Sequence, residues 1–293
     1  MADASVGAEG PRRRSVQCGS PCGLHRIAYV EWGDPRNRDV LVCVHGLTRT
    51  GRDFDALARE LCSRWRVVCP DVAGRGESDR LADPAHYVVP QYVADMVTLI
   101  ARLDVDSVSW VGTSLGGLIG MGLAAQPGAP VSRLVLNDVG AVVSRQSLAR
   151  IASYVGKAPS FSSIEQAEQY IRSISTPFGP HSDAQWRFLT ETWLRRNDDG
   201  TLRAHYDARI AQTALVPEKD LELWSVYDAV RCPTLVLRGE DSDLLSRDTA
   251  AEMARRGPRA RVVEIRGVGH APTLLHADQI AIVRDFLLEG ASQ

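Results

Sequence analysis

The apolar residues of this chain follow two alternating patterns, one typical of strands and one typical of helices. Short apolar runs such as residues 39–46 (DVLVCVHG) and 108–112 (VSWVG) predict buried strands, and residues 25–33 (HRIAYVEWG) alternate like an edge strand. Between such runs, segments such as residues 91–105 (QYVADMVTLIARLDV) place apolar side chains three and four positions apart, as in an amphipathic helix. The alternation predicts an α/β fold whose sheet is mostly parallel, with helices on both faces.

The strand pattern stops between residues 141 and 228 and returns with runs such as residues 233–239 (PTLVLRG). We therefore expect a core made of residues 21–140 and 229–293, interrupted by a helical insertion at residues 141–228. The insertion is expected to contain helices at residues 146–156, 163–174 and 182–196.

Residues 1–20 are expected to form a loose N-terminal extension, because they are small and polar, carry three consecutive arginines and lack the apolar stretch of a secretory signal. The net charge of −2 offers no basic surface for nucleic acid or anionic lipid. No apolar run approaches the length of a membrane span. The six cysteines lack the paired spacing of a zinc site, so no metal is expected, and they fit a reducing cytoplasm.

A serine lies between glycines in Gly112-Thr113-Ser114-Leu115-Gly116, at the junction of a predicted strand and a predicted helix. In this context G-x-S-x-G is typical of a nucleophile elbow, a turn so tight that side chains two residues from the serine would clash. The turn lifts the serine hydroxyl above the sheet edge, and the next helix points its N-terminal N–H groups at the same place. Ser114 is therefore the candidate nucleophile.

A serine nucleophile needs a general base, and His270 is the best placed of the seven histidines. It lies on the glycine-rich loop RGVGHAPTLLH, directly after a predicted strand. This loop belongs to the carboxyl edge of the sheet, where α/β folds build their sites. At neutral pH a histidine there can accept the serine proton.

The base in turn needs a carboxylate that fixes its orientation and tautomer. In the loop LRGEDSDLLS we expect Asp243 to be this acid, because burial of Leu244 and Leu245 would turn it inward. Asp241 is the alternative acid. Asp138, at the end of the predicted strand RLVLND, is a third candidate, although its simpler interpretation is a turn residue. The order serine, acid, histidine matches that of nucleophile-elbow enzymes.

The oxyanion of an ester transition state needs hydrogen-bond donors. In the run VCVHGLTRT, Gly46 lets the backbone bend so that the N–H of Leu47 can face the site, and the N–H of Leu115 would be its partner. His45 is expected to be structural. Arg49 and Arg52 are candidates for contact with a substrate carboxylate, although a solvated helix face is the simpler interpretation.

Five stretches in this order make the chain resemble the α/β-hydrolase superfamily over about residues 25–289: VHGLTRTGRDF, PDVAGRGESD, WVGTSLGGLIG, LRGEDSDLL and GVGHAPTL. It is similar to bacterial serine hydrolases of the esterase and lactonase type that carry a helical cap. The resemblance implies an eight-stranded sheet and a lid formed by about residues 141–228. The turn His45-Gly46-Leu47 departs from the HGGG run of some esterases.

The sequence thus predicts a serine hydrolase that cleaves a small carboxylic ester or lactone through an acyl-enzyme, with Ser114, His270 and Asp243 as its triad and no metal or organic cofactor. A carbon–carbon bond hydrolase of ring-cleavage products is the nearest alternative, and a ligand-binding receptor without turnover is the alternative from another class. Aromatic residues in the insertion predict an apolar acyl or alcohol pocket: Tyr154, Phe161, Tyr170, Phe178, Trp186, Phe188, Trp193 and Tyr206.

Overall fold

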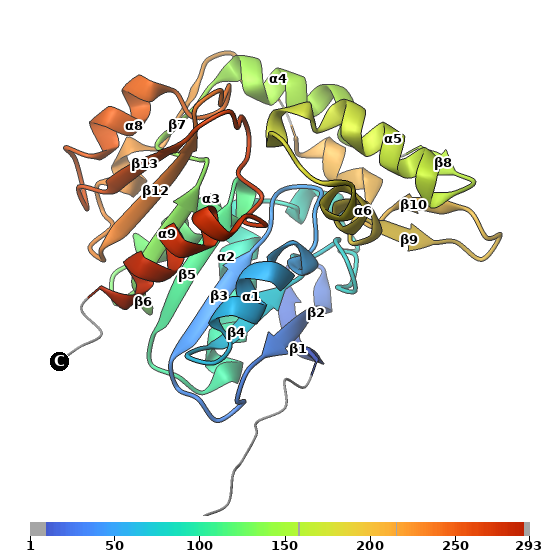
Figure 1. The fold of residues 1–293 in the computed structure, drawn as a ribbon. Helices are drawn as coiled ribbons and strands as arrows, with labels where there is room; N and C mark the ends of the chain where they lie inside the picture. The colour runs from blue at the N-terminus through green and yellow to red at the C-terminus, as the bar shows by residue number, and fades with distance from the viewer. Residues whose placement is uncertain (1–9, 158, 215, 290–293) are drawn as a thin grey trace, which may run out of the picture.

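The computed structural model describes residues 10–157, 159–214 and 216–289 and is built around one eight-stranded sheet (Figure 1). The strand order is β1-β2-β4-β3-β5-β6-β12-β13. The strands from β4 to β13 in this order are parallel, and β2 pairs antiparallel with β1 and β4. The predicted mostly parallel sheet is therefore confirmed. Its strands are β1 (Arg12–Ser20), β2 (Gly23–Trp32), β3 (Val40–Val44), β4 (Arg66–Pro70), β5 (Val108–Thr113), β6 (Val131–Asn137), β12 (Thr234–Gly239) and β13 (Arg261–Ile265).

Helices cover both faces of this sheet (Figure 1). The buried strand side chains alternate between two apolar cores: Leu41 packs with residues of α1 and α9, and Val42 packs with residues of α2, α3 and α8. In the part of the chain that the structure describes, no helix combines the length and the apolarity needed to cross a bilayer. The core helices are α1 (Asp55–Leu61), α2 (Val89–Leu103), α3 (Leu115–Ala124), α8 (Arg247–Met253) and α9 (Ala277–Leu288), with short 3-10 turns η1 (Gly51–Phe54) and η2 (Pro84–His86).

The expectation of a loose extension at residues 1–20 is wrong for Arg12–Ser20, which forms the edge strand β1. This strand pairs with β2 from Arg12 opposite Glu31 to Ser20 opposite Gly23. Val16 and Cys18 point into the core, two residues apart as in a strand, while Arg13 and Arg14 are exposed. The sheet therefore begins before residue 21, and residues 1–9 lie outside the described part of the chain.

The segment between β6 and β12 contains the three expected helices, each preceded by a serine whose side chain accepts an N-terminal N–H: Ser144, Ser163 and Ser182. The third helix is shorter than predicted, because the turn at residues 197–200 (NDDG) folds Leu194–Arg196 back as a hairpin strand. The elements are β7 (Val142–Val143), α4 (Arg145–Tyr154), β8 (Ser160–Phe161), α5 (Ile164–Ile174), η3 (Thr176–Phe178), α6 (Asp183–Glu191), β9 (Leu194–Arg196), β10 (Leu202–Ala204), η4 (Ala208–Gln212), β11 (Leu221–Glu222) and α7 (Trp224–Tyr227).

This inserted segment lies over the end of the sheet from which the site loops emerge (Figure 1). Thr50, in the loop after β3, donates to the carbonyl of Thr192 at 3.0 Å. His181 contacts the hydroxyl of Thr273, in the loop after β13, at 2.8 Å. These contacts join the inserted segment to the loops that follow β3 and β13.

Candidate active site

Ser114 occupies the sharp turn between β5 and α3. Its φ of 52° and ψ of −113° lie outside the regions that residues other than glycine usually adopt, at a cost of about 1–3 kcal/mol. A Cβ on Gly112 would lie 2.2 Å from the carbonyl oxygen of Gly116, and a Cβ on Gly116 would lie 1.9 Å from that of Val44. The two glycines let the strand, the helix and the neighbouring strand approach closely enough to hold the serine in this conformation.

His270 approaches this serine from the loop between β13 and α9. Its Nε2 lies 3.0 Å from Ser114 Oγ, within reach for transfer of the hydroxyl proton. The His270 side chain is 12% exposed, so the contact is largely shielded from solvent. The structure therefore brings together the expected nucleophile and the expected base.

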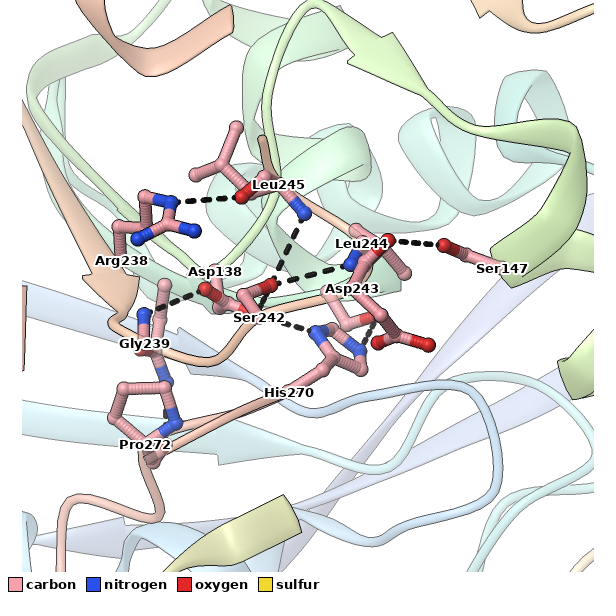
Figure 2. Close-up of polar contacts among 12 residues, drawn as sticks. Asp138, Ser147, Arg238, Gly239, Ser242, Asp243, Leu244, Leu245, His270 and Pro272 are labelled. Atoms are coloured by element: carbon pink, nitrogen blue, oxygen red, sulfur yellow. Dashed lines mark hydrogen bonds and ion pairs between the residues drawn. The ribbon is translucent and has the colours of Figure 1, made fainter. Parts of the chain in front are cut away.

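The carboxylate beside His270 belongs to Asp138 (Figure 2). Nδ1 of His270 lies 2.7 Å from Asp138 Oδ2, and with Nδ1 as the donor, Nε2 is free to accept the proton of Ser114. Asp138 is fully buried and follows β6 directly. Its Oδ1 accepts the N–H of Gly239 at 2.8 Å, and its Oδ2 accepts the hydroxyl of Ser242 at 2.6 Å.

The expectation that Asp243 contacts His270 is therefore wrong, and so is the Asp241 alternative. Leu244 and Leu245 are buried as expected, but the inward side chain before them is that of Ser242. Its Oγ accepts the N–H groups of Leu244 and Leu245 at 3.2 and 3.1 Å, and its hydroxyl reaches Asp138. These hydrogen bonds to Ser242 hold the turn in a conformation that leaves Asp243 facing outward.

Outside the turn, Asp243 forms a two-point ion pair with Arg150 of α4, with separations of 2.6 and 3.0 Å. Its side chain is 45% exposed. The hydroxyl of Ser147, also on α4, donates to the Asp243 carbonyl at 2.5 Å. Asp241 is exposed, and its backbone N–H donates to Val268. The outer carboxylate of this loop therefore joins the inserted segment to the core.

Asn137, directly before Asp138, ties the site loops together, which the sequence pattern did not indicate. Its side-chain amide donates to Thr113 Oγ1 at 2.9 Å and to the carbonyl of Pro272 at 2.8 Å. One side chain therefore links the residue before Ser114 to the loop that carries His270.

Leu47 and Leu115, the residues expected to supply the oxyanion donors, both lie beside Ser114. Leu115 is the first residue of α3, so its N–H has no partner within the helix. Gly46 lies against Ser114, with its hypothetical Cβ 3.8 Å from that of the serine, and Leu47 lines the cavities beside Ser114. The role of Leu47 and Leu115 as oxyanion donors stays a prediction.

The turn that carries Leu47 is held by buried side chains. His45 accepts the N–H of Val72 at 2.9 Å and donates to the carbonyl of Gly46 at 2.7 Å. Complete burial lowers the pKa of His45 to about 3, so this ring is neutral. Its role is structural, as expected. The buried Arg75 donates from Nε to the carbonyl of Leu47 at 2.9 Å. These contacts fix the direction of the Leu47 peptide.

Asp71 anchors the neighbouring loop PDVAGRGESD. Its carboxylate accepts the N–H groups of Gly51 and Glu77 at 2.7 and 2.9 Å. Burial raises its pKa to about 6, although these two hydrogen bonds oppose the shift. The loop also carries Arg75, so it supports the turn at Leu47.

Two cavities open on either side of Ser114. The first, here called the His270-side cavity, has a volume of about 120 Å³ and is lined by residues that include His270, Leu47, Arg49, Arg150, Lys157 and Tyr154. The second, here called the apolar cavity, has a volume of about 360 Å³ and is lined by residues that include Leu115, Leu118, Val139, Val143, Leu148 and Ile210. Ser114, Leu47 and Ile151 belong to both linings. The hydroxyl therefore lies between a cavity that combines three cations with aromatic and aliphatic side chains and a cavity whose lining, within the described residues, carries no charged residue.

The aromatic residues of the insertion are divided between these cavities and the packing of the segment itself. Phe161, Tyr170 and Trp193 pack together, with ring centroids 5.4–6.3 Å apart. Phe161 and Trp186 are buried, and Phe188 faces a different surface pocket. The aromatic residues that line the His270-side cavity are Tyr154, Tyr170, Phe178, Trp193 and Tyr206.

Arg49 and Arg52, the arginines first considered for a substrate carboxylate, are held by acids of their own segment. Arg49 pairs with Asp53 at 2.6 Å, and Arg52 pairs with Asp55. Arg49 nevertheless lines the His270-side cavity. The other cations of that cavity, Arg150 and Lys157, come from the inserted segment, where no motif identified them.

Two groups of side chains have the types and spacing to hold a metal ion within the described ranges, and neither includes a residue of the Ser114 site. Cys18, His25 and Asp95 form a buried group under β1, and Cys22, Asp83 and His86 form a more exposed one. In the first group, His25 Nε2 already pairs with Asp95 at 3.0 Å.

Comparison with known proteins places these features in a family. A model of the alpha/beta hydrolase family matches residues 41–283. A 3-hydroxybutyrate-oligomer hydrolase from Cupriavidus necator is 52% identical over 285 residues, which cover 94% of this chain and 97% of that protein.

Solved structures agree with this match. A putative hydrolase from Rickettsia typhi superposes with a TM-score of 0.89 at 31% identity, covering 95% of this chain and 99% of the other. An alpha/beta hydrolase from Novosphingobium aromaticivorans superposes with a TM-score of 0.86 at 36% identity, covering 96% and 99%.

Proposed function

This chain belongs to the alpha/beta hydrolase family and is a hydrolase of ester bonds, and we propose that it cleaves linear oligomers of 3-hydroxybutyrate by a Ser114–His270–Asp138 mechanism. The substrate is proposed from the 52% identity, over nearly the full length of both chains, to a 3-hydroxybutyrate-oligomer hydrolase. The mechanism is proposed from the chain of contacts that runs from Ser114 through His270 to the buried Asp138. That chain of contacts is the observation on which the proposal depends.

In the first half of the reaction, Ser114 Oγ attacks the ester carbonyl carbon while His270 Nε2 takes the hydroxyl proton. The negative charge on the carbonyl oxygen is stabilised by the N–H groups of Leu47 and Leu115. The bond to the alkoxy oxygen then breaks, and the imidazolium returns its proton to that oxygen. The products are an acyl-Ser114 ester and a free alcohol.

In the second half, water replaces the alcohol. His270 removes one proton from the water as its oxygen attacks the acyl carbon, the bond to Ser114 Oγ breaks, and the proton passes back to the serine. Asp138 accepts the hydrogen bond from Nδ1 throughout and stabilises the imidazolium formed in each half. The sum is an ester and water converted to an acid and an alcohol.

The inserted segment, residues 141–228, is proposed to act as a cap over the substrate. It supplies Arg150, Ile151, Tyr154 and Lys157 to the space beside the serine. It is tied to the core by the Arg150–Asp243 ion pair and the Thr50–Thr192 hydrogen bond. A cytoplasmic location stays a prediction; its support is that all six cysteines are free.

A direct assay tests this function. The purified protein is incubated with the 3-hydroxybutyrate dimer and trimer, and the released monomer is measured; a nitrophenyl butyrate ester and a ring-cleavage dienone are run in parallel. Hydrolysis of the oligomers, abolished by Ser114→Ala, is the expected result. Faster turnover of the dienone would replace the proposal with carbon–carbon bond hydrolysis. Failure of a fluorophosphonate to label Ser114 in the folded protein would indicate a binding protein without turnover.

A further inference from the structure

The position of His270 determines which half of an ester lies in which cavity. The imidazole must return its proton to the departing alkoxy oxygen, so the alcohol half has to lie beside Nε2. His270 lines the smaller, basic cavity and does not line the apolar one. The alcohol half of the substrate therefore lies in the His270-side cavity, and the acyl half lies in the apolar cavity.

The His270-side cavity presents positive charge to its contents. Its lining includes Arg49, Arg150 and Lys157, whereas Asp53 and Asp243, the acidic partners of the two arginines, are not part of the lining. Arg150 uses Nε and Nη2 for Asp243, which leaves donors on Nη1. Lys157 is exposed and has three donors of its own.

The apolar cavity differs in size as well as in charge. It is about 360 Å³, against about 120 Å³ for the His270-side cavity. The smaller volume corresponds to about four water molecules at ~30 Å³ each, which suits one short hydroxy-acid unit better than a chain of them. The larger one has room for a longer acyl chain.

The chemistry of a linear 3-hydroxybutyrate oligomer matches this asymmetry. The acyl half of each ester bond extends toward the hydroxyl end of the chain and carries no ionic charge. The alcohol half extends toward the other end and carries the terminal carboxylate. When the last ester bond lies at Ser114, the departing alcohol is a single 3-hydroxybutyrate anion.

We infer that Arg150 and Lys157 bind the terminal carboxylate of the oligomer, an inference that rests on the proposed function. The enzyme then removes one unit at a time from the carboxylate end. Arg150 and Lys157 then determine specificity, and they take no part in the proton transfers. The ion pair with Asp243 holds the Arg150 guanidinium at the cavity wall. A bound carboxylate gains charge-assisted hydrogen bonds from both side chains.

The first experiment compares two trimers that differ only at the carboxylate end, one a free acid and the other its methyl ester. Each is labelled with ¹³C in the carboxyl-terminal unit, and kcat/KM and the first released product are measured. The wild-type enzyme is expected to prefer the free acid by about 10-fold or more. The first monomer released from the free acid is expected to carry the label.

The second experiment changes the cations. The double variant Arg150→Met/Lys157→Met is expected to bring the free-acid preference close to 1, mainly through a higher KM for the free acid. A merely structural disturbance would slow both substrates equally and leave their ratio unchanged. Arg145→Met is the matched control, because Arg145 is an exposed residue of the same helix that does not line the cavity; its preference should equal that of the wild type.

Four results would overturn the inference. An equal rate on the two trimers, or an unlabelled first monomer, would show that the carboxylate is not recognised, while the oligomer-hydrolase function would stand. A double variant that keeps the full preference would assign recognition to other groups. Absence of any trimer hydrolysis by an enzyme whose Ser114 reacts with a fluorophosphonate would remove the proposed substrate and, with it, this inference.

Discussion

The elbow around Ser114 and the loop after β12 were both expected to supply a catalytic group, but only the elbow places the expected residue beside His270. At the elbow, backbone contacts dictate the residue types: glycine is needed at positions 112 and 116 because carbonyl oxygens occupy the space of a side chain. In the loop after β12, any of several acids could point inward. The outcome depends on Ser242, whose hydrogen bonds to Leu244 and Leu245 close the turn with Asp243 outside. A motif therefore identifies a residue reliably when sterics leave no alternative.

The largest effect is expected at the elbow itself. Ser114→Ala removes the nucleophile and His270→Ala removes the base, and each should lower kcat by about 10⁴-fold or more, which is about 5.5 kcal/mol of barrier. Steady-state kinetics on nitrophenyl butyrate measure this loss, with circular dichroism to check that the variants are folded. Near-normal turnover of either variant would remove that residue from the mechanism.

The steric part of the comparison is tested by adding one methyl group. Gly116→Ala would place a carbon 1.9 Å from the carbonyl oxygen of Val44, and the backbone must move to relieve the clash. We expect a loss of about 3 kcal/mol in the free energy of unfolding, measured by denaturant titration.

Gly122→Ala, in the same helix, is the matched control for this variant. The nearest atom to its new Cβ would be Val93 Cγ2 at 3.5 Å, an ordinary contact. Removing a helix-interior glycine should raise stability by about 0.5–1 kcal/mol. Equal effects of the two substitutions would show that the elbow is not sterically constrained.

A smaller effect is expected from replacing Ser242, in the loop after β12. Ser242→Ala removes the hydroxyl donor to Asp138 and the acceptor of two backbone N–H groups. Because Asp138 keeps its contacts with Gly239 and His270, kcat should fall only about 10-fold, or about 1.4 kcal/mol, with KM unchanged. Ser242→Thr keeps the hydroxyl and should restore most of the rate; a threonine variant as slow as alanine would argue against the hydrogen bond.

The smallest effect is expected at the outer carboxylate. Asp243→Asn breaks an ion pair whose side chains are 38% and 45% exposed, and such pairs contribute at most about 1 kcal/mol. The melting temperature should change little, and kcat on the uncharged nitrophenyl butyrate should stay within about threefold of the wild type. A large drop in melting temperature would show that this contact holds the inserted segment in place.

The sequence was sufficient to predict the structural features that depend on the local pattern of residues. The period of the apolar residues located the parallel strands and the helices on both faces, and the glycine spacing located the tight turn at Ser114. The edge strand Arg12–Ser20 was missed because its pairing partner, not its composition, makes it a strand. Three arginines suggest a solvated tail, but alternate positions bury Val16 and Cys18.

The acid beside His270 was misjudged for a related reason. Asp138 and Asp243 both follow strands whose carboxyl ends reach the same edge of the sheet, and β6 is adjacent to β12. The turn after β12 directs Ser242 toward Asp138 and Asp243 toward Arg150, and sequence spacing does not encode that choice. Arg150 and Lys157 were not considered because helical spacing places them on the insertion without indicating which cavity they face.

The claim that Asp138 orients His270 is tested most directly by comparing kcat for Asp138→Asn and Asp243→Asn on nitrophenyl butyrate at the same pH. Replacing Asp138 removes the carboxylate that fixes the histidine tautomer, so we predict a loss of about 10³-fold or more, with Asp243→Asn close to the wild type. The account would be contradicted by an Asp138→Asn enzyme that keeps a tenth or more of the wild-type kcat. It would also be contradicted by an Asp243→Asn enzyme whose kcat falls by about 10³-fold.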